Sequence, residues 1–204
     1  AKRWADSGAE LIHIVDLDAA IEGTPKNLST IEKIASSIAV PLQIGGGIRN
    51  EETAERYLDI KGVMRVILGT LALSEPKTIE SLARRYPGRI AIGIDAKDGF
   101  VAIKGWVEVT KTKAIDLAKK FEGMGVAAII YTDISRDGML TGPNVEATKK
   151  LIDTIKIPVI ASGGVSKIDD ITALKKIKAT GAIVGKALYS GAIDLKESIR
   201  AARD

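Results

Sequence analysis

The 204-residue sequence has no cysteine, a single histidine and few aromatic residues. Without cysteine there is no disulfide and no thiolate metal ligand, and His13 alone cannot build a metal centre or a Ser-His-Asp relay. Lysine and arginine are spread evenly and only two Phe and two Trp are present, so we expect no nucleic-acid partner. No apolar run approaches about 18 residues and no signal peptide is visible, so we expect a cytoplasmic protein with no membrane partner.

The composition is that of an ordinary globular chain. Hydrophobic residues make up 46% of the sequence and charged residues 27%, which is typical of a soluble domain with a sizeable core. The net charge of +4 is mildly basic, and it favours phosphorylated small molecules as ligands.

Short β-branched apolar runs alternate with amphipathic stretches along the whole sequence. The apolar runs begin near Leu11, Pro41, Arg65, Ile90, Ala127, Ile157 and Gly181. The amphipathic stretches are Ile31–Ile38, Glu51–Asp59, Thr78–Arg85, Thr112–Phe121, Glu146–Ile155 and Asp169–Ile177. This alternation predicts a parallel sheet covered by helices, and no linker interrupts it. We therefore expect one domain over residues 1–204.

The sequence repeats itself with an offset of 117 residues. Val40–Ile48 returns as Ile157–Val165 (157 − 40 = 117), and Asp16 returns as Asp133. The Gly69 turn returns at Gly185 with the offset reduced by one (185 − 69 = 116). A repeat of this length is about half of a (β/α)₈ barrel. We therefore predict an α/β TIM barrel built from two half-barrel repeats, approximately 1–88 and 89–204.

One strand of the predicted barrel has no counterpart in this sequence. The strand at Ile90–Asp95 predicts a partner that begins before Ala1 (90 − 117 = −27). We favour truncation over circular permutation, because only a terminal helix through Asp204 is expected after Tyr189. On this view the full-length form is a monomer, whereas these 204 residues alone are nearly inactive and self-associate through unpaired strand edges.

Glycine turns follow two strands in each half. They comprise Gly46 and Gly47, Gly69 and Thr70, Gly163 and Gly164, and Gly185 and Lys186. Glycine lets backbone N–H groups approach an anion closely, and the last loops of such barrels frequently hold phosphate. The alternative is that these glycines only permit tight turns. Their occurrence as two matched pairs predicts two phosphate sites and a small-molecule substrate with a phosphate at each end.

Carboxylates also follow the strands. Strand alternation places Asp95 on the face of Ala91 and Gly93, where a carboxylate can act as general acid or base. We assign Asp137 and Thr132 to catalysis beside it. The alternatives are structural acids for the two aspartates and an ordinary β-branched strand residue for Thr132. Asp16 is assigned to substrate binding, with a structural cap as the alternative.

Three further residues are assigned to the substrate. Trp106 lies after an apparent hairpin that turns at Asp98-Gly99, and its ring is suited to stack on a heterocycle. Arg49 directly follows the first glycine run, and Ser162 directly precedes the second. The structural alternatives are a hydrophobic plug for Trp106 and a solvated helix-start residue for Arg49. His13 is predicted to be a packed side chain.

Taken together, the motifs resemble those of the histidine-biosynthesis isomerase that acts on phosphoribosylformimino-aminoimidazole carboxamide ribotide. The resemblance covers the whole chain. It comprises Val15-Asp16-Leu17, Gln43–Arg49, Ile94-Asp95 with Asp98-Gly99, Lys104-Gly105-Trp106, Thr132–Ile134 with Asp137-Gly138, Ala161–Gly164 and Val184–Lys186. The Lys-Gly-Trp element separates this isomerase from the related cyclase that makes imidazole glycerol phosphate.

The resemblance implies an Amadori rearrangement of an aminoaldose to an aminoketose, with no cofactor and no metal. In the family, a carboxylate on the fifth strand protonates the ribose ring oxygen, and Asp95 matches this acid. A carboxylate on the first strand removes the proton from C2, and no residue of this sequence matches it. The alternatives are the cyclase, an isomerase that also serves tryptophan synthesis, and a non-catalytic phosphate-binding barrel fragment.

Overall fold

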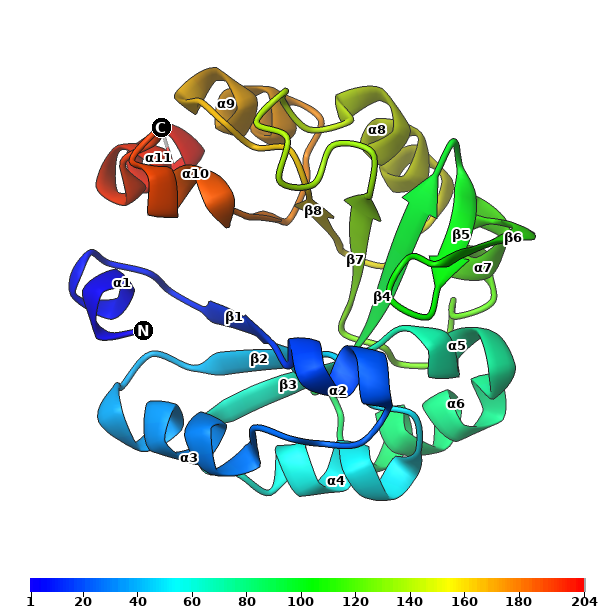
Figure 1. Ribbon diagram of the computed structural model, residues 1–204. Helices are drawn as coiled ribbons and strands as arrows, with labels where there is room; N and C mark the ends of the chain where they lie inside the picture. The colour runs from blue at the N-terminus through cyan, green and yellow to red at the C-terminus, as the bar shows by residue number, and fades with distance from the viewer. Residues whose placement is uncertain (204) are drawn as a thin grey trace.

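The computed structural model describes residues 1–203, and its strands form one sheet that curves into a nearly closed barrel (Figure 1). Seven strands run parallel in the order β1-β2-β3-β4-β7-β8-β9. Their bounds are β1 Ile12–Val15, β2 Leu42–Gly45, β3 Val63–Leu68, β4 Ile90–Lys97, β7 Ala128–Asp133, β8 Val159–Ser162 and β9 Gly181–Ile183. These strands coincide with the seven predicted apolar runs, so the predicted α/β barrel class is confirmed.

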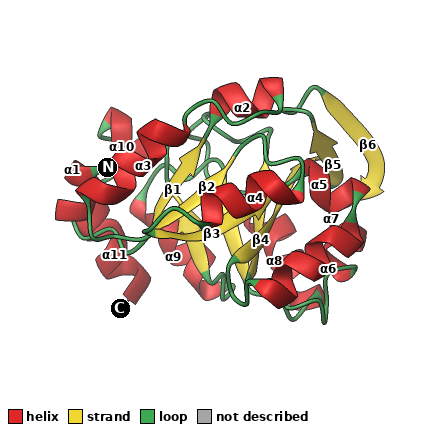
Figure 2. Ribbon diagram, turned by 90° about the horizontal axis from the view of Figure 1, so that it is seen from below, coloured by secondary structure: helices red, strands yellow, loops and turns green. Residues whose placement is uncertain are grey.

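Helices cover the outer face of the sheet (Figure 2). The helices at the predicted amphipathic stretches are α3 Leu28–Ser37, α4 Glu51–Leu58, α6 Pro76–Arg85, α7 Ala114–Lys119, α8 Val145–Thr154 and α9 Ile168–Lys176, and the expected terminal helix is α11 Leu195–Arg203. Short helices were not predicted at α2 Leu17–Glu22, α5 Thr70–Ser74 and α10 Lys186–Ser190, and α1 spans Lys2–Asp6. Asp204, the predicted end of the last helix, lies outside the described residues. Within residues 1–203 no helix combines the length and the apolar character needed to cross a bilayer.

Strand alternation separates an inner core from an outer one. Inside the barrel, the buried side chains of Ile67, Ala91 and Ile130 form a small cluster with those of neighbouring strands. Ile92 and Ile94, one position along β4, belong instead to the large cluster between sheet and helices. Gly93 faces inward, because a Cβ there would meet the Ile67 side chain at 3.1 Å. Asp95 shares this inward parity, as predicted.

An antiparallel hairpin interrupts the alternation after β4. The strand pairs with β5 (Phe100–Ile103) through a tight Asp98-Gly99 turn, and both turn residues have positive φ angles of 52° and 82°. This is the backbone geometry that Asp-Gly favours in two-residue hairpins, so the predicted hairpin is confirmed. A third strand, β6 (Glu108–Lys113), was not predicted; it delays the start of α7 from the expected Thr112 to Ala114. The hairpin matters because the β5–β6 turn contains Trp106.

A chain of polar side chains crosses strands β1 to β3 on their inward face. Arg65 Nε donates to Gln43 Oε1 at 2.7 Å, and Gln43 Nε2 lies 2.9 Å from His13 Nδ1. Burial, together with the positive charge of Arg65, lowers the pKa of His13 to about 4. His13 is therefore neutral at pH 7 and packed, as predicted.

Candidate functional site

The candidate acid lies where β4 and β7 end side by side. Asp95 and Thr132 are register partners across the two strands, and Thr132 is buried. Burial raises the pKa of Asp95; hydrogen bonds from Trp106 and Thr132 oppose this rise, and the neighbouring charge of Asp137 adds to it. A carboxyl group with a raised pKa holds a proton over a wider pH range, which is what a general acid requires. The structure thus brings Asp95, Thr132 and Asp137 together.

Trp106 lies directly against this carboxylate. Its indole Nε1 donates a hydrogen bond of 2.8 Å to Asp95 Oδ2. The residue is 42% exposed, so the ring is not a buried plug over the barrel. The predicted stacking on substrate stays a prediction, but the position of the ring beside Asp95 supports it.

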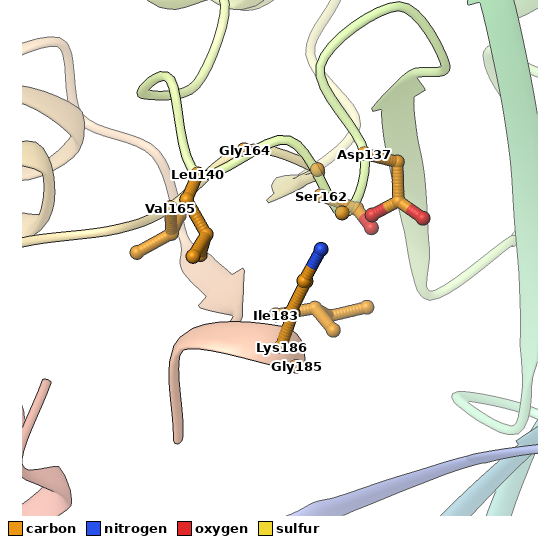
Figure 3. A pocket seen from close by; sticks show the side chains of 10 residues that line it. Asp137, Leu140, Ser162, Gly164, Val165, Ile183, Gly185 and Lys186 are labelled. Carbon is orange, nitrogen blue, oxygen red and sulfur yellow. The ribbon is translucent and has the colours of Figure 1, made fainter. Parts of the chain in front are cut away.

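An open pocket lies beyond β8 and β9. Its lining includes Asp137, Ser162, Gly164, Gly185 and Lys186. Figure 3 shows the Lys186 side chain rising from the start of α10 toward Asp137 and Ser162. Partial desolvation raises the pKa of Asp137, although the Gly138 backbone N–H opposes this. Several residues assigned to substrate or phosphate therefore share one pocket.

The glycine runs pack tightly against the loop that follows the preceding strand. A Cβ on Gly46 would lie 2.4 Å from the Asp16 carbonyl oxygen, and a Cβ on Gly163 would lie 2.9 Å from that of Asp133. Both glycines also have positive φ angles. Close backbone packing therefore explains why these positions need glycine. Phosphate binding by their N–H groups stays a prediction.

Asp16 lies at the centre of this packing in the first half. It is 2% exposed, and its oxygens accept hydrogen bonds from the Ala19, Lys26 and Asn27 backbones, the Asn27 side chain and the Tyr57 hydroxyl. Burial alone raises the pKa of Asp16, but the hydrogen bonds from Ala19, Asn27 and Lys26 outweigh it and lower the pKa. This supports the structural alternative, and a contact with substrate stays a prediction.

The second half repeats the arrangement. Asp133 accepts bonds from the Ser135 backbone at 2.9 Å and from Asn144 Nδ2 at 2.6 Å. Asn144 and Asn27 are themselves repeat partners (144 − 27 = 117), and sequence reasoning missed both. Extending the repeat from Asp16 and Asp133 into the following loops would have found them.

The remaining predicted residues lie at the same edge of the sheet. Arg49 Nη2 donates hydrogen bonds to the backbone carbonyls of Ala20 and Ile21, near the end of α2. In this structure Arg49 therefore stabilises the end of that short helix. Gly69 and Gly185 have nearly equal backbone angles (φ −98°, ψ −89° and φ −107°, ψ −96°), and each begins a five-residue helix. The second pair of turns is thus repeated in conformation as well as in sequence.

The fold and the site define a (β/α) barrel with its polar side chains and glycine turns gathered at the carboxyl ends of the strands, where such barrels place their active sites. In the described part of the chain, no three metal-binding side chains of the His, Cys, Asp or Glu type are grouped as ligands.

Comparison with known proteins narrows this class. The family model described as "Histidine biosynthesis protein" matches residues 1–194, and the chain belongs to that family. It is 58% identical over 202 residues to the 1-(5-phosphoribosyl)-5-((5-phosphoribosylamino)methylideneamino)imidazole-4-carboxamide isomerase of Geobacter sulfurreducens. It is 57% and 55% identical to the isomerases of the same name from Trichlorobacter lovleyi and Thermodesulfovibrio yellowstonii. Each alignment covers 98% of this chain and 82% of the relative.

The close packing of the glycines predicts that two Gly→Ala substitutions lower the free energy of unfolding by different amounts. Gly46→Ala should destabilise the protein by about 2–5 kcal/mol, because the left-handed backbone and the clash with Asp16 both add to the cost. Gly88→Ala is the matched control: its φ is also positive, but a Cβ there meets nothing within 4 Å, so about 1–2 kcal/mol is expected. Urea unfolding of both variants checks this, and equal losses would contradict it.

The hydrogen bonds to Asp16 predict that the stability of the fold depends on pH. Because the folded-state pKa lies below the unfolded one, Asp16 stabilises the fold fully above the unfolded pKa, and this contribution is lost as the pH falls through the folded pKa. Asp16→Asn should lower stability at pH 7 and flatten its decline below about pH 4. Urea midpoints between pH 7 and pH 3 measure both effects. Asp153→Asn, which removes only an exposed ion pair with Lys149, should keep the original slope.

Proposed function

We propose that this chain catalyses the reaction for which its relatives are named, the isomerisation of a phosphoribosylamino-methylideneamino imidazole carboxamide that carries two phosphoribosyl groups. The observation that best supports it is the position of Asp95. This carboxyl group lies on the inward face of its strand, between two matched sets of glycine turns, with a pKa raised by burial. An acid between two anion sites suits a substrate that is phosphorylated at both ends.

In this proposal Asp95 protonates the ribose ring oxygen and so opens the ring. Thr132 orients the Asp95 carboxyl group, and Asp137 maintains its proton affinity through like-charge repulsion. Proton removal from C2 then completes the change from aldose to ketose. No residue of this sequence matches the carboxylate that performs that step in the family.

The two phosphates are assigned to the two sets of glycine turns. Support comes from their repeated backbone geometry and from Lys186, whose ammonium group points into the pocket beside Gly164 and Gly185 (Figure 3). The partner of this chain is thus a small-molecule bisphosphate. Because the family is one of histidine biosynthesis, we also place the reaction in the cytoplasm.

Binding and turnover should be tested separately. Calorimetry with the bisphosphate aminoaldose measures binding to the 204-residue chain, and a chain that binds neither this compound nor its product contradicts the proposal. Phosphoribosylanthranilate serves as the second ligand, because an isomerase shared with tryptophan synthesis would accept it. We expect tight binding of the bisphosphate and no tight binding of phosphoribosylanthranilate.

The role of Asp95 predicts a selective loss of turnover. In a chain extended before Ala1 by the corresponding segment of the Geobacter sulfurreducens relative, Asp95→Asn should lower kcat by about 10²–10⁴-fold, since an amide cannot deliver the proton. Substrate affinity should change far less. Asp98→Asn, on the exposed hairpin turn of the same strand pair, is the matched control and should leave kcat unchanged. Similar losses in both variants would remove Asp95 from its assigned role.

A further inference from the structure

The hydrogen bond between Trp106 and Asp95 presents a difficulty for the proposed acid. The indole Nε1–H occupies Asp95 Oδ2, one of the two oxygens from which a proton has to be delivered. An indole N–H is only a donor, so this contact favours the ionised carboxylate and opposes the protonated acid. The contact seen here therefore suits a resting protein better than a reacting one.

The turn that presents Trp106 is under backbone strain. Lys104, Gly105 and Trp106 have φ angles of 55°, 65° and 73°, so three successive residues adopt the left-handed region, and two of them are not glycine. This conformation is disfavoured for side-chain-bearing residues and persists only where surrounding contacts enforce it.

The antiparallel ladder between β5 and β6 closes this turn at Ile103 and Glu108, whereas the side chains of the turn add less. The Trp106 ring is 42% exposed, and the ion pair between Lys104 and Glu108 lies in solvent, where such pairs contribute little. The hydrogen bond to Asp95 ties the tip of the turn to β4. Breaking it costs one hydrogen bond and leaves the β5–β6 ladder in place, so the indole can leave Asp95 without unfolding the hairpin.

The other neighbours of Asp95 do not replace the indole. Ala102, its partner across β5, is apolar, and Thr132 donates from β7. Asp137, in the loop after β7, bears a charge of the same sign and so favours the protonated form of Asp95. When the indole leaves, the protonation equilibrium of Asp95 therefore shifts toward the neutral acid.

We propose that Trp106 is a positioning residue that holds Asp95 as a carboxylate in the unliganded protein and releases it when substrate takes the place of the indole N–H. The inference rests on the proposed function of Asp95. On release the carboxylate takes up one proton from solvent, gives it to the substrate ring oxygen as the ring C–O bond breaks, and returns to the carboxylate. The acid is thus primed only where substrate is present.

The resting contact can be tested without any turnover. Trp4→Phe leaves Trp106 as the single tryptophan, so its fluorescence reports the state of the neighbouring carboxylate. We expect an emission change with a single midpoint as the pH is lowered, and its disappearance in Trp4→Phe/Asp95→Asn. Trp4→Phe/Asp98→Asn should retain the change. A titration that persists without Asp95, or that is absent from the parent, overturns the proposal even if the isomerase assignment holds.

The release step is tested by pH–rate profiles of the extended chain. The basic limb of kcat/KM reports Asp95 in the free enzyme, where the indole lowers its pKa, and that of kcat reports Asp95 with substrate bound. The kcat/KM limb should lie at lower pH than the kcat limb, and Trp106→Phe should narrow the gap by moving the kcat/KM limb to higher pH while the kcat limb stays in place. If the kcat/KM limb does not move in Trp106→Phe, the indole does not control the acid.

Discussion

The structure depends on one close backbone contact that is made twice. The glycine run after one strand packs onto the loop after the previous strand, at Gly46 against Asp16 and at Gly163 against Asp133. In each copy the Asp carboxylate and an Asn eleven residues later tie down the loop that receives the glycine. Carboxylate, amide and glycine therefore form one unit, which fixes the edge of the sheet where the site lies.

The two half-barrel repeats differ in the side chains that they place at matching positions. At the repeat offset, Asp137 corresponds to Ala20 (137 − 117 = 20) and Thr132 to Val15 (132 − 117 = 15), while Lys186 corresponds to Thr70 (186 − 116 = 70). The first half uses its loop to bury Asp16 and to bind the Arg49 side chain. The second half keeps a more open loop and a pocket. The positions assigned to the site in the second half thus correspond to positions in the first half that carry no such side chain.

The sequence was sufficient to predict the seven parallel strands but not the side-chain contacts between them. Seven apolar runs and a repeat fix a parallel barrel, and alternation along β4 correctly turned Asp95 inward. Strand β6 was missed because its sequence, Glu108–Lys113, is polar apart from one valine and has no buried residue. Periodicity also could not reveal that Trp106 would reach Asp95, because a turn with three left-handed residues decides that contact. Such contacts depend on tertiary geometry rather than on local preference.

The placement of Asp95 bears on the reaction proposed for this chain. Burial raises the pKa of Asp95. On the proposed function the ligand carries two phosphates, and their negative charge would act in the same direction, because a nearby negative charge disfavours a second one. Substrate binding and protonation of the acid would then be coupled electrostatically as well as through the indole, so that a bisphosphate would help to generate the neutral Asp95 that the proposed ring opening requires.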